Sequence, residues 1–427
     1  MRPFPLHQRP SGWQSQLPER TPHPPLKGSH RAEVVIIGAG YTGVACARAW
    51  QALRPDARVV MLDAEAVGDG SPGRNSGFML EIALANDVND SALAGMRRMN
   101  DLSRQAMDSL RQAVADHGIE CGLARTGTYR AARGPKGLAS IEAYRRFLTA
   151  SGLAFESLEQ GALTERLGTT YYAKGLYSPD CWLVQPAALI RGLVDALPAG
   201  ITCFEHTPAR TVERDGGHWR VQTPEGELTS PHVVLANNAF SRALGADGSR
   251  LATIYTYAAL TPPLADALRD QTGGHEWGLL PAHRLGCTLR TTADHRMMIR
   301  SFYSLEREQD NARIAAQLHA RLTARFPALG DTPFDTVWGG TTGLTYNGAP
   351  LWGAIAPGLH VSAGCNGGGI VKGTLLGEAL AHQALDVPCA DIHGLFGTPS
   401  WMPPAPLRRL GFEAISLKER YKGRHEA

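Results

Sequence analysis

The strongest pattern near the start of the chain is an apolar run followed by an amphipathic segment. Residues 34–37 are four consecutive β-branched apolar residues, as in a strand buried on both faces of a parallel sheet. Residues 41–53 place small and apolar side chains on one helical face, and 57–64 contain a second apolar run. This pattern predicts a strand, a tight turn, a helix and a second strand, which is typical of an α/β fold.

Farther along, the apolar spacing alternates between helical and strand-like. Segments 185–197 and 310–326 have helical periodicity, and Pro186 stands near the start of the first, where proline is tolerated. Strands are predicted within 201–236, 251–264, 286–292, 296–304 and 359–363. A proline-rich break after residue 400 precedes a basic amphipathic helix. We expect this helix to pack on the protein, with a membrane-surface helix as the alternative.

Composition and charge narrow the class of protein. A chain of 427 residues, 43% of them hydrophobic and 47 of them glycine, fits two interleaved domains better than one core. A formal net charge of +3 does not indicate a strongly basic surface of the kind that binds nucleic acids. Seven scattered cysteines without a C-x-x-C pair indicate reduced thiols and a cytoplasmic location. The polar, proline-rich start lacks a signal-peptide pattern, and no apolar run approaches the ~18 residues of a transmembrane segment.

The turn after the first strand matches the pattern G-x-G-x-x-G, at Gly38, Gly40 and Gly43. In this pattern the first glycine permits the tight turn, the second admits a pyrophosphate, and the third lets helix and strand pack closely. Asp63 ends the second strand, 20 residues after Gly43, where a carboxylate accepts a ribose hydroxyl. The order of these features predicts a dinucleotide site. The motif alone does not separate NAD from FAD.

Two further glycine-rich segments extend this site. Residues 68–77 combine glycines with Arg74 and several polar donors that can meet a pyrophosphate or ring oxygens. Residues 364–369 connect a short strand to an apolar-periodic helix, whose first amides are free to bind an anion. A chain that returns near its end to a site begun at residue 38 suits a large, two-part cofactor.

Four stretches, taken in order, resemble the FAD-dependent D-amino-acid oxidase superfamily. They are VVIIGAGYTGVACA (34–47), GSPGRNSGF (70–78), the segment 206–241, and TTGLTYNGAPLWG with AGCNGGGIVKG (341–373). The resemblance covers about residues 25–385 and is closest to the glycine oxidase, sarcosine oxidase and γ-glutamylputrescine oxidase branch. It implies FAD as the cofactor and a Rossmann-like FAD-binding domain interleaved with an α+β substrate domain on an antiparallel sheet.

The resemblance also implies where FAD binds. The glycines of the first turn would hold the pyrophosphate, Asp63 the adenosine ribose, and the backbone of Ala209 the adenine. Residues 71–77 would reach the pyrophosphate and the isoalloxazine ring, and 366–371 the pyrimidine edge of that ring. The expected cofactor-binding residues are Gly38, Gly40, Tyr41, Thr42, Gly43, Asp63, Ala64, Ser71, Arg74, Asn75, Ser76, Gly77, Ala209, Gly343, Asn366, Gly367, Gly368, Gly369, Ile370 and Val371.

The resemblance and the predicted elements together suggest where the two domains begin and end. The FAD-binding domain would comprise 31–115, 183–245 and 335–385, and the substrate domain 116–182 and 246–334. Residues 1–30 would be an N-terminal extension and 386–427 a C-terminal tail.

The substrate side departs from the amino-acid-oxidising relatives. Where they keep an arginine that binds the substrate carboxylate, this chain has Thr342. The remaining candidates to bind a carboxylate or polar tail of the substrate are Arg290, Arg300, Tyr255 and Tyr257. Alternatively, the two arginines lie on an exposed face of their strands and bind no substrate. Lys372 stands one residue beyond the lysine of sarcosine oxidases, so we expect no catalytic role for it.

Cysteine usage near the expected flavin site bears on how FAD is attached. Residues 341–346 lack the cysteine that forms a thioether to the ring in sarcosine oxidases, and Cys365 is expected to pack inward. We therefore expect non-covalent FAD. No metal-ligand spacing appears among the 15 histidines, so no metal is expected.

Together these features predict an FAD-dependent oxidoreductase that oxidises a C–N bond of a small-molecule amine or amino acid. A hydride would pass to the flavin, and the imine would then hydrolyse. The final electron acceptor would be O2 or an electron carrier. Three alternatives stay open: a dehydrogenase that passes electrons to a quinone or carrier, an oxidoreductase for 2-hydroxy acids, and a flavin-binding protein without turnover.

Overall fold

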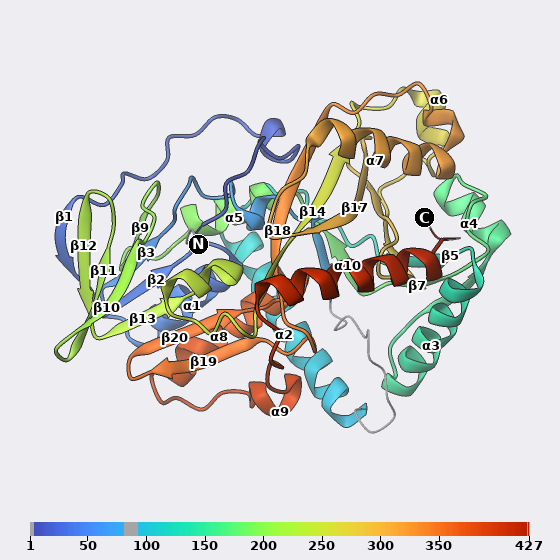
Figure 1. Cartoon of the computed structure of the whole chain (residues 1–427). Helices are drawn as coiled ribbons and strands as arrows, with labels where there is room; N and C mark the ends of the chain where they lie inside the picture. Colours follow the sequence, from blue (N-terminus) through green and yellow to red (C-terminus); the bar gives the residue numbers. More distant parts are fainter. Residues whose placement is uncertain (1–3, 81–92, 425, 427) are drawn as a thin grey trace.

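Two large sheets lie side by side in the computed structural model, which describes residues 4–80, 93–424 and 426 (Figure 1). The six-stranded sheet has every neighbouring pair parallel except β19 with β20. Its strands, in spatial order, are β19 (Leu351–Ala356), β20 (Leu359–Ala363), β13 (His232–Leu235), β2 (Val34–Ile37), β3 (Val59–Leu62) and β9 (Ile201–Phe204).

The six-stranded sheet is buried on both faces because alternate residues of its strands enter two different cores. Val34 and Ile36 face the core that contains α1 (Tyr41–Leu53) and α8 (Val371–Ala384). Val35 and Ile37 face the opposite core, shared with a four-stranded sheet. The strands of that sheet are β1 (Gly28–Arg31), β12 (Gly226–Ser230), β11 (His218–Gln222) and β10 (Thr211–Asp215).

The second large sheet has eight strands and is antiparallel except where β15 pairs with β5. Helix α7 (Asn311–Arg325) contributes Ile314, Leu318 and Leu322 to the core on one face. The strands are β18 (Thr336–Leu344), β14 (Ala252–Leu260), β17 (Met297–Leu305), β16 (Thr288–Thr291), β15 (Gly278–Pro281), β5 (Thr128–Ala132), β7 (Lys174–Ser178) and β6 (Glu156–Glu159).

The other elements surround or connect these layers (Figure 1). Strands β4 (Phe78–Leu80) and β8 (Cys181–Leu183) form a two-stranded sheet. Short 3₁₀ helices cover Gln14–Gln16, Ser71–Gly73, Asn238–Leu244 and Pro327–Leu329. The remaining helices are α2 (Leu93–Asp116), α3 (Pro135–Ser151), α4 (Gln160–Leu167), α5 (Pro186–Asp195), α6 (Asp266–Asp270), α9 (Ile392–Phe396) and α10 (Ala405–Lys422).

The observed elements confirm the expected mixed α/β class. Strands 34–37 and 359–363 and helix 41–53 have the predicted bounds. The expected domain boundary at 335 does not follow the sheets, since β18 belongs to the eight-stranded sheet rather than to the six-stranded one. The N-terminal extension is also integrated, because β1 pairs in parallel with β12. No helix in the described ranges is long and apolar enough to cross a bilayer.

Candidate functional site: a dinucleotide cradle joined to an arginine-lined wall

A cavity of about 1700 Å³ lies between the carboxyl edge of the six-stranded sheet and the eight-stranded sheet. Most of the expected cofactor residues line it, although they come from distant parts of the chain. They are Gly38, Gly40, Tyr41, Thr42, Asp63, Ala64, Ser71, Arg74, Asn75, Ser76, Ala209, Asn366, Gly367, Gly368, Gly369, Ile370 and Val371. Gly43, Gly77 and Gly343 do not line the cavity.

The first glycine turn has the geometry that its sequence requires. Gly38 has a φ of +111°, a conformation that favours glycine. A Cβ on Gly43 would lie 1.9 Å from the carbonyl oxygen of Gly38, so only glycine lets α1 approach the turn this closely. Helix α1 starts at Tyr41 without a side-chain cap, which leaves its first amides available to a phosphate. Gly43 therefore shapes the turn from behind, while Gly38 and Gly40 face the cavity.

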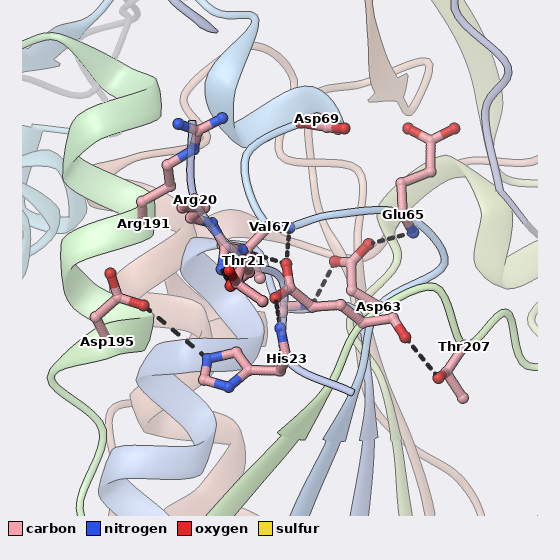
Figure 2. Close-up of polar contacts among 12 residues, drawn as sticks. Arg20, Thr21, His23, Asp63, Glu65, Val67, Asp69, Arg191, Asp195 and Thr207 are labelled. Carbon is pink, nitrogen blue, oxygen red and sulfur yellow. Dashed lines mark hydrogen bonds and ion pairs between the residues drawn. The ribbon is translucent and has the colours of Figure 1, made fainter. Parts of the chain in front are cut away.

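Asp63 stands at the end of β3 with its carboxylate oriented by two amides (Figure 2). The Ala39 amide donates to Oδ2 at 2.9 Å, and the Glu65 amide donates to Oδ1 at 3.1 Å. Burial raises the pKa of Asp63 to about 6. This geometry holds a carboxylate at the cavity wall next to the glycine turn, as an acceptor for a ribose hydroxyl requires.

Glu205 is a fully buried carboxylate that the motif analysis did not single out. It follows β9, the neighbour of β3, so it stands beside Asp63 at the same edge of the sheet. Its donors are the Arg20 guanidinium, the Val67 amide and, at 2.5 Å, the His23 amide (Figure 2). The available signal in the sequence was a carboxylate directly after a predicted strand, here the edge strand β9. Glu205 thereby joins the N-terminal extension to the loop that follows Asp63.

The side chains of the 69–77 loop mainly bond within the protein. Arg74 donates to the carbonyl oxygens of Asp69 (2.5 Å) and Gly339 (3.0 Å), and burial lowers its pKa to about 10. Asn75 donates to the Pro72 carbonyl at 2.6 Å and accepts from the Gly77 amide at 2.8 Å. Two nitrogens of the Arg74 guanidinium thus fix the loop, and since Arg74 also lines the cavity, its contact with the pyrophosphate stays a prediction.

The N-terminal extension braces this loop from outside. Ser11 Oγ donates to the Gly73 carbonyl at 2.8 Å, and Trp13 Nε1 donates to the Asn75 carbonyl at 2.7 Å. Trp13 is itself buried against Trp338 of β18. In the sequence the extension is only a polar, proline-rich segment. Nothing near Ser11 or Trp13 in the sequence indicates contacts with residues about sixty positions away.

The second glycine segment places the start of α8 at the cavity. Asn366 has a φ of +52°, and its side chain accepts from the Thr345 amide (3.0 Å) and donates to the Gly364 carbonyl (2.7 Å). Lys372 also lines the cavity; its Nζ lies 4.7 Å from the centre of the Phe396 ring, and burial lowers its pKa. The loop is therefore rigidly held where an anion or a ring oxygen could meet free amides.

The structure separates the two candidate arginines. Arg300 of β17 lines the cavity, half-buried, with its guanidinium carbon 5.3 Å from the centre of the Tyr303 ring. Within the described part of the chain its guanidinium makes no hydrogen bond or ion pair. Arg290 lies outside the cavity wall and is bound to Glu276 at 2.9 Å and to the Val184 carbonyl at 2.7 Å. The expectation that Arg290 binds substrate is thus revised, because its donors are already used.

The two candidate tyrosines are structural rather than reactive. Tyr257 lines the cavity, but its hydroxyl lies 2.6 Å from Ser304 Oγ and accepts from the Gln309 amide at 2.7 Å. Tyr255 is buried in the core of the eight-stranded sheet and is absent from the cavity wall. The Tyr257 hydroxyl is therefore already hydrogen-bonded and Tyr255 lies off the cavity wall, which leaves Arg300 as the better placed of the predicted substrate residues.

Cys365 also differs from its expected placement. It lines the cavity instead of packing inward, with Sγ 3.4 Å from Asn238 Nδ2 and 3.6 Å from Thr342 Oγ1. Thr342 lines the same wall. Among the residues that the structure describes, no group of three or more histidine, cysteine or acidic side chains could hold a metal ion.

Fold and site together define a mixed α/β protein with a cradle for a dinucleotide at the edge of its six-stranded sheet. Residues 33–383 match the model of the family described as FAD dependent oxidoreductase, and the chain belongs to that family. FAD is therefore its cofactor, and the cradle of glycines, free helix amides and Asp63 fits a flavin dinucleotide. The residues of the cradle would hold its pyrophosphate and ribose.

Three known proteins illustrate the similarity. The chain is 26% identical over 386 residues to a probable oxidoreductase OrdL of Rhizobium meliloti, covering 88% of each. It is 23% identical over 378 residues to the γ-glutamylputrescine oxidoreductase of Escherichia coli, covering 84% of this chain and 85% of the other. The structure of glycine oxidase from Geobacillus kaustophilus superposes with a TM-score of 0.74 at 22% identity, covering 86% of this chain and 99% of that one.

Gly40→Val should abolish FAD binding. A Cβ at Gly40 already lies 3.0 Å from Pro72 Cγ, and a valine side chain would occupy the pyrophosphate's approach to the backbone. The purified variant should be colourless, as measured by flavin absorbance per chain. Gly161→Val is the matched control, because a Cβ there meets nothing within 4 Å. A Gly40→Val protein as yellow as wild type would contradict the assigned cradle.

Acid precipitation should release the flavin into the supernatant. We propose that FAD is held non-covalently, since residues 341–346 contain no cysteine. Cys365 is the thiol in the cavity wall, so Cys365→Ser provides the control. Flavin retained in the wild-type pellet but freed in that variant would show a covalent bond and refute the proposal.

Proposed function

We propose that this protein oxidises a C–N bond of an amine or amino acid that carries an anionic tail. The substrate carbon loses a hydride while the nitrogen lone pair forms a C=N bond. Water then hydrolyses the imine to a carbonyl compound and ammonia or a smaller amine. FAD, when bound, supplies the acceptor for that hydride.

The observation that carries the proposal is the environment of Arg300. Its guanidinium lines the same cavity as the dinucleotide cradle and has no ion-pair partner in the described residues. A half-buried cation without an anion is an efficient site for a carboxylate, because water screens it less than a surface charge. Arg290, by contrast, is neutralised by Glu276 and cannot perform this role.

The neighbouring residues suit a substrate longer than glycine. Thr342 offers a hydroxyl where a carboxylate-binding arginine was expected, so the wall beside Cys365 carries no charge at that position. The carboxylate-binding group stands instead on β17 of the substrate sheet. Arg300 would therefore bind and orient the tail, leaving the amine end to lie against the flavin part of the cavity.

The comparisons support a nitrogen-containing substrate. One relative is named for γ-glutamylputrescine and one structural neighbour for glycine. A further neighbour is an iminodiacetate oxidase, with a TM-score of 0.66 at 18% identity. These names motivate the choice of an amine or amino acid over a 2-hydroxy acid.

Arg300→Ala should slow flavin reduction by the preferred substrate by about 10- to 150-fold. This range corresponds to about 1.5–3 kcal/mol for one charge-assisted hydrogen bond realised in the transition state. Anaerobic flavin bleaching would be followed with acid-tailed amines, D- and L-amino acids, glycine, sarcosine and 2-hydroxy acids. The bound FAD per chain should not change.

Arg290→Ala provides the contrast, because its expected defect is in stability. Removing the guanidinium leaves the Glu276 carboxylate, which is 17% exposed, without its partner. This should lower the free energy of unfolding by about 3 kcal/mol, the low end of the range for a broken buried pair, while the folded fraction keeps its rate of flavin reduction. Urea unfolding measures the first effect and stopped-flow bleaching the second. Glycine or hydroxy acids reducing the flavin fastest, or a fully active Arg300→Ala, would contradict the proposed function.

A further inference from the structure

Helix α10 starts near the junction of the two large sheets and runs across the front of the molecule toward β7 and α3 (Figure 1). Its inner side covers part of the cavity, with Phe412, Ile415, Ser416 and Glu419 among the lining residues. The helix is therefore a structural cover of the candidate site, and its other side faces outward.

The orientation of α10 is fixed at both ends. Near its start, Arg408 donates to the carbonyl oxygens of Leu251 (3.0 Å) and Gly248 (3.1 Å). Near its end, Glu419 pairs with His283 at 3.1 Å. Beyond it, the Glu426 carboxylate accepts from the Gly134 amide at 2.6 Å, at the start of α3. These contacts prevent the helix from rolling to bury its outer side.

The outer side of α10 is apolar. Leu407, Leu410, Leu417 and Tyr421 are between 58% and 71% exposed, and their spacing of three, seven and four residues places them in one stripe. Of the nine large hydrophobic side chains exposed in the described residues, five lie on α10, and the four other than Ile415 form this outer stripe. Such a concentration on one helix indicates an interaction surface.

Basic residues border this stripe on both sides. With about 100° of rotation per residue, Lys418 and Lys422 lie along one border, and Arg409 and Arg420 lie along the other together with Glu413. The two acidic residues of the helix are paired, Glu413 with Arg409 and Glu419 with His283. An apolar stripe between two basic borders is the arrangement of a helix that lies in a lipid headgroup layer.

Aromatic residues extend the surface beyond the helix. Trp401, just before α10, is 62% exposed, and Tyr346 is 74% exposed. Asn347 connects their two segments by donating to the Thr398 carbonyl at 2.8 Å and accepting from the Ser400 amide at 3.1 Å. Tryptophan and tyrosine favour the bilayer interface, where their rings meet apolar chains and their polar atoms meet water.

We propose that α10, with Trp401 and Tyr346, docks the protein on the surface of an anionic lipid bilayer. The leucines would enter the boundary between headgroups and acyl chains, while the lysines and arginines meet lipid phosphates. A second copy of the chain is the less suitable partner, because self-association would bring like-charged borders together. The proposal goes beyond the proposed function and does not depend on it.

The test is flotation of the FAD-loaded protein with vesicles of phosphatidylcholine containing phosphatidylglycerol, compared with phosphatidylcholine alone. Binding is expected to the anionic vesicles and to weaken with added salt. Leu417→Glu should partition about tenfold more weakly, since it removes a leucine that would enter the bilayer and adds a charge that anionic lipids repel. Ile355→Glu makes the same change of charge at an exposed apolar residue of β19 and should bind like wild type.

Flavin absorbance and far-UV circular dichroism would confirm that both variants are folded. The proposal would be overturned if wild-type protein does not float with the anionic vesicles, or if Leu417→Glu binds them as well as wild type does. Sedimentation that shows a Leu417-dependent dimer without vesicle binding would assign the surface to a second copy instead. Since no readout requires turnover, failure here is distinguishable from failure of the proposed function.

Discussion

The buried charge of Glu205 is the constraint on which the cofactor side of this structure depends. A carboxylate with no exposure to water is costly unless donors surround it. Its donors come from two segments, the Arg20 guanidinium and the His23 amide from the N-terminal extension and the Val67 amide from the loop after Asp63. Satisfying this one side chain therefore fixes the path of both segments at the edge of the sheet.

The consequences extend to the glycine-rich loop and the substrate sheet. Once the extension is held at Arg20, its earlier residues lie against the loop, where Trp13 and Ser11 bond to the carbonyls of Asn75 and Gly73. The same loop bonds to β18 through Arg74 and the Gly339 carbonyl. The cofactor cradle and the wall that carries Arg300 are thus parts of one hydrogen-bonded framework.

Local sequence patterns predicted the elements whose formation depends on near neighbours. The strand 34–37, its glycine turn and helix 41–53 follow from β-branched residues, glycines and helical spacing within twenty positions. Partners distant in sequence were not predictable. Arg290 and Arg300 occupy similar strands, but only the structure shows that Glu276 and Val184 bind the first. Trp13 was missed for the same reason, and Glu205 was missed although its place directly after a strand was a local signal, because its donors at residues 20, 23 and 67 are distant in sequence.

The central claim is that one cavity joins a flavin cradle to an unpaired arginine. The most direct test is a crystal structure of the protein with FAD bound. We expect the pyrophosphate at Gly38 and Gly40, the ribose at Asp63, the ring edge against 366–371, and Arg300 facing the open side of the ring with no acidic partner. A flavin ring elsewhere, or an Arg300 that is paired with a side chain of the protein, would contradict the account.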